Sequence, residues 1–202
     1  MISFAKYASI KDKYCICYFG HVDEYLVALR LVRPIIERKY PGLRLHFGCK
    51  DDKAHHLHGC EILKVSEIKA RREDFAHVRE LKYNGKDHPV EQLMDECDIP
   101  DWTVRSSTAE TRGDKCVIVS KSDYPTKPLE TRQIDLLKKK AKGLGHIPLL
   151  NEPWKGAGVV MGVESVDLLE SAAAGAITYL VPNGVGTRLY KRLFPFLEVV
   201  HT

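Results

Sequence analysis

The sequence lacks any long hydrophobic run. Its longest apolar stretches, such as residues 172–177, fall far short of the ~20 apolar residues that a membrane-spanning helix needs. The first residues also lack the basic and then apolar pattern of a secretory leader. These absences predict a cytoplasmic protein with no integral membrane segment.

Cysteine is present, but not at the density of a disulfide scaffold: there are six cysteines in 202 residues. Several lie in apolar runs, where a thiol behaves as a small hydrophobic side chain, so we expect reduced, structural cysteines. One stretch carries zinc-ligand residue types without a paired C-x-x-C motif, and neighbouring histidines are more often simply exposed. The residues of that stretch are Cys49, His55, His56, His58 and Cys60. Because it lacks the paired motif, we predict no metal and no cofactor.

A strong excess of charge of one sign is also absent. The formal net charge is +4, with 29% charged and 44% hydrophobic residues, which is typical of a globular chain. A mild positive charge fits an anionic ligand as well as a nucleic acid. Arg71, Arg72 and Arg79 lie near scattered aromatic residues, but no base-reading motif accompanies them, so we predict no nucleic-acid partner.

The first half of the chain alternates between strand and helix patterns. An apolar run over residues 14–19 predicts a buried strand, and apolar residues spaced by three and four over residues 26–36 predict a helix. A second strand is expected over residues 43–47, which completes a βαβ unit. The pattern then repeats more weakly, with strands over 61–65 and 76–81 and helices over 66–73 and 88–97.

The apolar periodicity lapses from Asp98 to Asp114 and then restarts. We predict an N-terminal domain over residues 1–100, a linker over 101–114 and a C-terminal domain over 115–202. The predicted fold class is α/β, with two small Rossmann-like domains facing a cleft. In the second half we expect strands over 116–120, 146–150, 157–161 and 177–181, and helices over 129–142, 165–174 and 186–194.

Three segments are candidates for chemistry, and the first is the strand-to-helix turn at residues 162–167. The first turn of a helix offers free backbone N–H groups and the positive end of the helix dipole, so it can hold a diphosphate. The alternative is that Glu164, Ser165 and Asp167 merely cap the helix and complement its dipole.

The second candidate is the loop at residues 124–130. Pro125 and Pro128 restrict its backbone, so Lys127 projects from a defined place and could neutralise a leaving diphosphate. The alternative is an ordinary solvated lysine.

The third candidate is the turn after the first strand, which carries His21, Asp23 and Glu24. A carboxylate or imidazole at this edge of a sheet can act as a general base if it reaches within ~3 Å of the acceptor hydroxyl. Helix capping by Asp23 is the alternative.

These segments together resemble the ADP-heptose:lipopolysaccharide heptosyltransferase family. The stretch over residues 24–45 is similar to that family's opening βα unit, with Asp23 and Glu24 in the place of a Gly-Asp pair. Residues 124–130 resemble its lysine loop. Residues 162–165, 172–175 and 178–182 resemble its Gly-Val-Asp-Thr, Ala-Ala-Gly and closing-strand motifs.

The resemblance implies a GT-B arrangement and an inverting, metal-independent transfer of a sugar from a nucleotide-diphosphate-sugar donor to a glycan or other hydroxyl acceptor. It implies that Glu24 is the base, that Thr126 and Lys127 contact the donor, and that Glu164, Ser165 and Val166 belong to the nucleotide site. Three departures stand out: Val166 replaces the family's glycine, Leu169 replaces its histidine, and only residues 151–156 stand where the family inserts a further helix. They leave open a relative that binds a nucleotide or sugar without catalysis.

Overall fold

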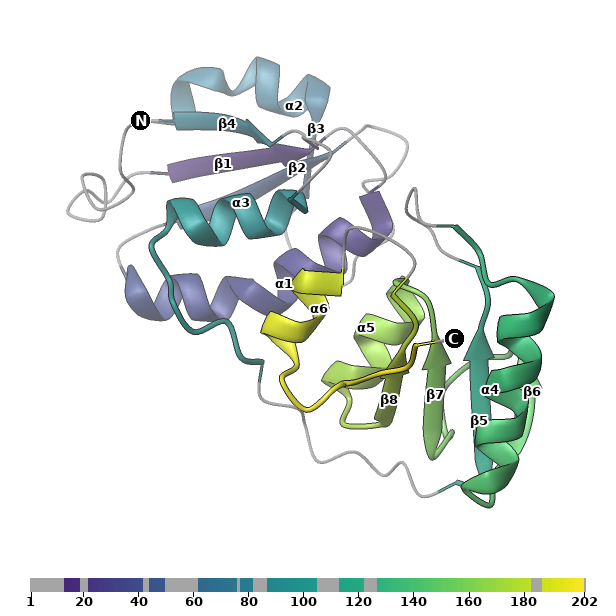
Figure 1. Ribbon diagram of the computed structural model, residues 1–202. Helices are drawn as coiled ribbons and strands as arrows, with labels where there is room; N and C mark the ends of the chain where they lie inside the picture. The colour runs from purple at the N-terminus through teal and green to yellow at the C-terminus, as the bar shows by residue number, and fades with distance from the viewer. Residues whose placement is uncertain are drawn as a thin grey trace. The chain divides into compact units, whose positions relative to one another are not determined.

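A computed structural model describes residues 13–18, 22–41, 44–49, 62–75, 77–81, 87–104, 113–121, 127–182 and 187–201. The chain divides into two compact units, Met1–Trp102 and Thr103–Thr202. Each unit is built on its own parallel sheet (Figure 1).

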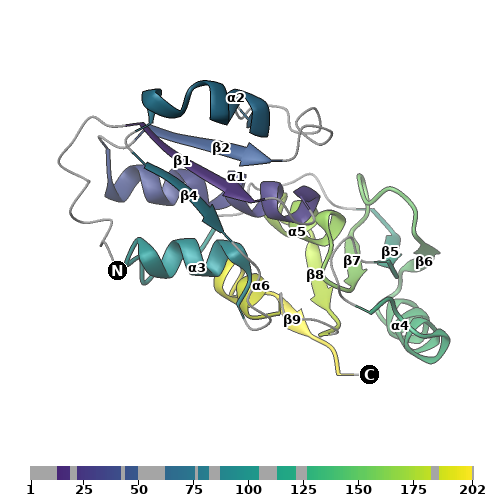
Figure 2. The ribbon, with the colours of Figure 1, turned by 90° about the horizontal axis from the view of Figure 1, so that it is seen from above.

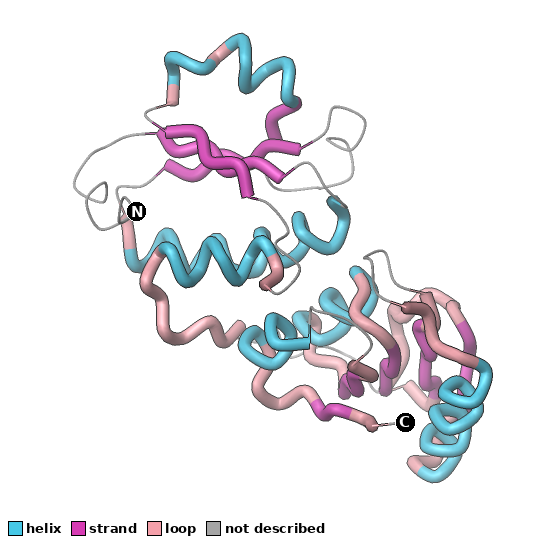
Figure 3. Tube along the Cα trace, turned by 45° about the horizontal axis from the view of Figure 1, so that its top comes forward, coloured by secondary structure: helices cyan, strands magenta, loops and turns pink. Residues whose placement is uncertain are grey.

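The first unit contains a four-stranded parallel sheet in the order β3-β2-β1-β4. Helices α1 and α3 contact each other and cover one face of this sheet, while α2 covers the opposite face (Figures 1 and 3). The elements are β1 (Lys13–Tyr18), α1 (Val22–Lys39), β2 (Arg44–Cys49), β3 (Ile62–Lys64), α2 (Val65–Ala70), the 3₁₀ turn η3 (Arg72–Asp74), β4 (His77–Leu81) and α3 (Pro89–Glu96).

The position of α1 follows from its apolar spacing. Leu29, Val32 and Ile36 recur at three and four residues, and all three side chains are buried. Pro34 lies on the exposed side of the helix. The chain runs from β1 outward to β2 and β3 and then returns to β4 on the other side of β1, so the switch point of this sheet lies between β1 and β4.

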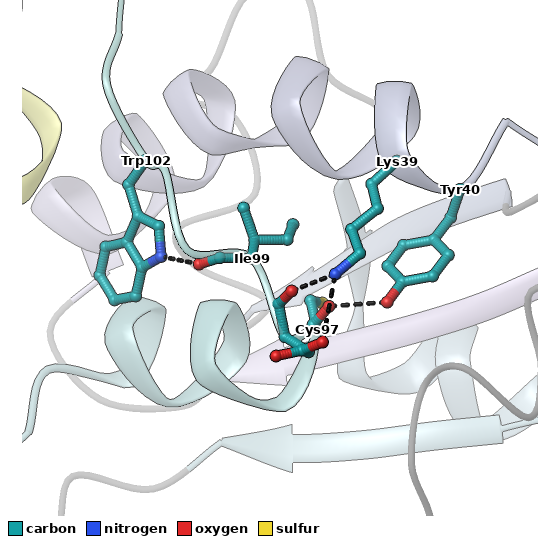
Figure 4. Close-up of polar contacts among 6 residues, drawn as sticks. Lys39, Tyr40, Cys97, Ile99 and Trp102 are labelled. Atoms are coloured by element: carbon teal, nitrogen blue, oxygen red, sulfur yellow. Dashed lines mark hydrogen bonds and ion pairs between the residues drawn. The ribbon is translucent and has the colours of Figure 1, made fainter.

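The ends of α1 and α3 are joined by polar contacts (Figure 4). The Tyr40 hydroxyl donates to the backbone oxygen of Cys97 at 2.6 Å, and the Lys39 ammonium donates to the backbone oxygen of Asp98. The indole N–H of Trp102 donates to the backbone oxygen of Ile99 at 2.5 Å. Ile99 and Trp102 are buried, although the apolar periodicity of the sequence lapses from Asp98 onward.

Helix α3 begins with a buried capping box. His88 Nδ1 accepts from the backbone N–H of Val90 at 3.1 Å, and Glu91 Oε2 accepts from the backbone N–H of His88 at 3.0 Å. Both side chains are fully buried, and burial lowers the pKa of His88 to about 3. The imidazole is therefore neutral in the folded protein at every physiological pH.

This pKa predicts a loss of stability in acid. Below pH ~6.5 His88 becomes protonated in the unfolded chain, whereas in the folded chain it stays neutral down to about pH 3. The free energy of unfolding therefore falls by up to ~1.4 kcal/mol per pH unit in that window. At pH 5 we expect a loss of ~2 kcal/mol relative to pH 7, measured by urea unfolding. His88→Asn keeps an N-cap acceptor but removes the titrating imidazole, so the free energy of unfolding should depend on pH less steeply, by the contribution of about one proton. An unchanged pH dependence would contradict the assignment of this effect to His88.

The second unit contains a five-stranded parallel sheet in the order β6-β5-β7-β8-β9. Helices α4 and α5 cover opposite faces (Figure 2), and the α4 face encloses an apolar core from β5, β7, β8 and α4. The elements are β5 (Lys115–Val119), α4 (Thr131–Gly143), β6 (Ile147–Leu150), β7 (Val159–Gly162), α5 (Val166–Ala173), β8 (Ile177–Leu180), α6 (Thr187–Leu193) and β9 (Glu198–Val199).

The switch point of the second sheet lies between β5 and β7, because the chain leaves β5 for β6 on one side and then crosses to β7 on the other. The two strands approach closely at their carboxyl ends. A Cβ atom on Gly162 would lie 2.3 Å from the backbone oxygen of Val119, so this register requires glycine at that position.

The predicted α/β class with two Rossmann-like units is confirmed. Two details of the predicted elements were wrong. The helix expected over residues 66–73 is interrupted after Ala70 and continues as the 3₁₀ turn, and β9 was not predicted at all. Among the described residues, no helix combines the length and apolar character needed to cross a bilayer.

Candidate functional site

The carboxyl ends of β5 and β6 are joined through Ser120 and Asn151. Asn151 Oδ1 accepts from the Ser120 backbone N–H at 2.9 Å, and Asn151 Nδ2 donates to Ser120 Oγ at 2.9 Å. The backbone N–H of Asn151 donates to Ile118 O at 2.8 Å. Asn151 has a φ of +52°, a left-handed conformation that asparagine tolerates better than most residues.

Ser120 also anchors the segment that carries Lys127. The Leu129 backbone N–H donates to the Ser120 backbone oxygen at 2.9 Å, and the Leu129 side chain lies in the α4-face core. Lys127 stands two residues before this anchor, separated from it by Pro128, and is exposed. The structure therefore places Lys127 at the carboxyl edge of the second sheet; Thr126 lies outside the described residues.

In the turn between β7 and α5, the polar side chains form hydrogen bonds within the second unit. Glu164 is fully buried and its Oε1 accepts from Thr187 Oγ1 at 2.6 Å, at the start of α6. Ser165 is 2% exposed, and its Oγ accepts from the Leu168 backbone N–H at 3.3 Å as the N-cap of α5. Ser165 therefore caps α5, as the capping alternative predicts, whereas Glu164 joins the turn to α6 instead of capping α5.

Tyr190 completes this arrangement. Its hydroxyl accepts from the Ser165 backbone N–H at 2.7 Å and donates to the Ser165 backbone oxygen at 2.8 Å. The Ser165 amide is thus already bonded. Beyond it, the first turn of α5 has the half-buried Val166 and the exposed Asp167.

We expect Tyr190→Phe to lower the free energy of unfolding of the second unit by ~1–3 kcal/mol. The variant leaves the backbone N–H of buried Ser165 without this partner, and a buried unsatisfied group costs about that much; the Ser165 backbone oxygen still accepts from the Leu169 N–H at 3.1 Å. Thermal or urea unfolding measures the loss. Tyr179→Phe serves as a matched control at another buried tyrosine. If both variants lower the free energy of unfolding equally, the hydrogen bonds to Ser165 do not contribute to stability beyond the loss of a tyrosine hydroxyl.

The structure puts Asp23 and Glu24 in the first turn of α1, directly after β1. This is the carboxyl edge of the first sheet, beside the switch point between β1 and β4. Only the backbone placement of these two residues is described, and His21 lies outside the described residues.

The arginines behind the nucleic-acid alternative have local partners. Arg71 forms an ion pair with Asp74 at 3.1 Å, Arg72 donates to the backbone oxygen of Phe75 at 3.0 Å, and Arg79 forms an ion pair with Glu96. Arg71 and Arg79 are therefore paired with carboxylates of the first unit.

Three cysteines, Cys49, Cys97 and Cys116, have side chains that the structure describes, and all three are buried. Burial raises the pKa of Cys97 and Cys116 to about 12, so neither forms a thiolate at neutral pH. In the described part of the chain, no three histidine, cysteine, aspartate or glutamate side chains gather as metal ligands. His55, His56, His58 and Cys60 lie outside it.

Sequence reasoning missed Ser120, Asn151, Thr187 and Tyr190. The sequence could have predicted a turn at Asn151. This asparagine follows an apolar strand directly and precedes Glu-Pro, a pattern typical of a turn with a left-handed residue. Tyr190 gave no such signal, since its partner Ser165 is 25 residues away in sequence.

No family model matches the sequence, and no curated protein matches it. Among solved structures, the iron-containing dodecameric glycosyltransferase TibC from enterotoxigenic E. coli H10407 aligns over 95% of this chain and 63% of its own, at 12% identity and a TM-score of 0.59. A glycosyl transferase family 9 protein from Veillonella parvula DSM 2008 aligns over 94% and 87%, at 8% identity and a TM-score of 0.53.

A third structure, E. coli heptosyltransferase WaaC with ADP, aligns over 84% of this chain and 86% of its own at 11% identity, with a TM-score of 0.43. The chain spans 63% of the length of TibC. At these identities the likeness shows the fold: the chain has the Rossmann-like α/β fold found in glycosyltransferases.

Proposed function

We propose that the protein is a glycosyltransferase that moves a sugar from a nucleotide-diphosphate-sugar donor to a hydroxyl acceptor. One observation carries the proposal: in both sheets, a segment with side chains suited to this chemistry follows a strand beside the switch point. Asp23 and Glu24 follow β1, Lys127 lies in the loop after β5, and Glu164 follows β7. Ligands of open parallel sheets bind at such places.

In this proposal the second unit holds the donor. Lys127 bonds the diphosphate and neutralises the charge that develops as the sugar–phosphate bond breaks. Glu164 and Ser165 act from within the turn rather than by direct contact, because both are buried and bonded to α6 and α5. Val166, the half-buried first residue of α5, is the proposed direct contact of this turn with the nucleotide.

The first unit supplies the base. The acceptor oxygen attacks the anomeric carbon on the face opposite the diphosphate, the bond from that carbon to the diphosphate oxygen breaks, and the acceptor proton passes to a carboxylate. Glu24 is the proposed recipient, with Asp23 and His21 as competitors. The anomeric configuration inverts because one displacement takes place.

The proposal needs no metal ion, since Lys127 supplies the neutralising charge. We expect EDTA to leave sugar transfer within about twofold of the untreated rate, measured with a labelled donor. A loss of activity that Zn²⁺ restores would contradict this expectation and would direct attention to Cys49 and the histidines after it.

A second candidate is a protein that binds a nucleotide or sugar without transferring it. Two observations favour it. The side chains of Glu164 and Ser165 form hydrogen bonds to α6 and α5, and residues 151–158 connect β6 to β7 without a helix. Donor-hydrolysis and transfer assays separate the candidates. Saturable donor binding without turnover supports the second, and turnover supports the first.

A further inference from the structure

We infer that Asn151 is a positioning residue for Lys127 and sets the affinity of the second unit for a nucleoside diphosphate. The inference rests on the proposed function. Its basis is the uninterrupted series of bonds from Asn151 through Ser120 and Leu129 to the base of the lysine loop.

The first step is the hold of Asn151 on Ser120. Asn151 is itself fixed, because its backbone N–H bonds to Ile118 O at 2.8 Å and extends the pairing of β6 with β5. Its side-chain amide then bonds both the backbone N–H and the hydroxyl of Ser120. Without this amide, the backbone N–H of Ser120, a residue only 8% exposed, would lose the acceptor that fixes the end of β5.

The second step runs from Ser120 to Lys127. The backbone oxygen of Ser120 accepts from the Leu129 N–H at 2.9 Å, and this bond ties the residue after β5 to the residue two positions beyond Lys127. The buried Leu129 side chain and the fixed φ of Pro128 leave little freedom between the anchor and Lys127. A shift of Ser120 therefore moves the origin of the Lys127 side chain.

The left-handed conformation makes a clean test possible. Asn151→Gly removes the amide side chain and tolerates the φ of +52°, so the backbone is not strained by the change. Asp98→Gly is a matched control, because Asp98 also has a positive φ, of 51°, and belongs to the first unit.

The experiment measures the dissociation constants of ADP, UDP, GDP and CDP by isothermal titration calorimetry in the full chain. For whichever nucleotide binds, we expect Asn151→Gly to weaken affinity about 5-fold, the effect of one net hydrogen bond, and Asp98→Gly to leave it unchanged. In the Lys127→Ala background, Asn151→Gly should have no further effect, because both changes act through the same side chain.

A second readout follows the loop base without any ligand. Amide exchange at Leu129 should be faster in Asn151→Gly than in the parent and unchanged in Asp98→Gly.

Equal affinity of the parent and Asn151→Gly, additive effects of Asn151→Gly and Lys127→Ala, or unchanged exchange at Leu129 would each overturn the inference while leaving the proposed function intact. A parent that binds none of the four nucleotides overturns the inference together with the proposed function.

Discussion

Glu24→Gln is expected to lower the turnover of sugar transfer by at least ~100-fold, because a general base typically contributes ~10²–10⁴-fold. Glu24 is the third residue of α1, at the carboxyl edge of β1. Glutamine keeps the size of the side chain but cannot accept the acceptor proton. The donor dissociation constant should stay nearly unchanged, since donor binding is assigned to the second unit; steady-state kinetics and donor titration measure the two quantities separately.

A matched control is Glu37→Gln, which changes a half-exposed carboxylate near the other end of α1 that pairs with Arg33. It should turn over like the parent. If Glu24→Gln also turns over normally while Asp23→Asn or His21→Ala abolishes transfer, the base must be reassigned within the turn. If all three match the parent, the turn is only a helix cap and the catalytic account loses its main support.

Lys127→Ala is expected to weaken the binding of a nucleoside diphosphate by ~10–150-fold. This corresponds to ~1.5–3 kcal/mol, the range for a hydrogen bond that involves a charged group. Isothermal titration of the parent and the variant measures the effect. Lys139→Ala, at an exposed lysine on α4, removes the same charge from another surface and should leave affinity unchanged.

Unchanged affinity in Lys127→Ala would remove this lysine from the donor site. An equal loss in Lys127→Ala and Lys139→Ala would show that only the overall charge of the unit matters. In either case the loop after β5 would be an ordinary solvated surface.

Most strands and helices could be predicted because their apolar spacing is local. The burial of Leu29, Val32 and Ile36 follows directly from their recurrence at three and four residues. β9 could not be predicted this way, since two residues, Glu198 and Val199, are too short to show a period. Its pairing with β8 depends on tertiary contacts.

The candidate site was predictable in position but not in detail. Strand ends can be located from local apolar patterns, and these patterns alone assign Lys127 and Glu24 to sheet edges. Whether Glu164 and Ser165 face a ligand or the interior could not be assigned, because that depends on Thr187 and Tyr190, more than twenty residues away. The burial of Trp102 could not be predicted for the same reason, because it depends on packing that no local pattern reveals.

Thermal unfolding in the presence of nucleoside diphosphates and nucleotide-sugars tests the central claim most directly. A ligand at 100 times its dissociation constant stabilises the folded protein by ~2.7 kcal/mol, which raises the Tm by several degrees. The account predicts such a shift with at least one nucleotide in the parent and in Lys139→Ala, and a much smaller shift at the same concentration in Lys127→Ala. No shift with any nucleoside diphosphate or nucleotide-sugar would contradict it.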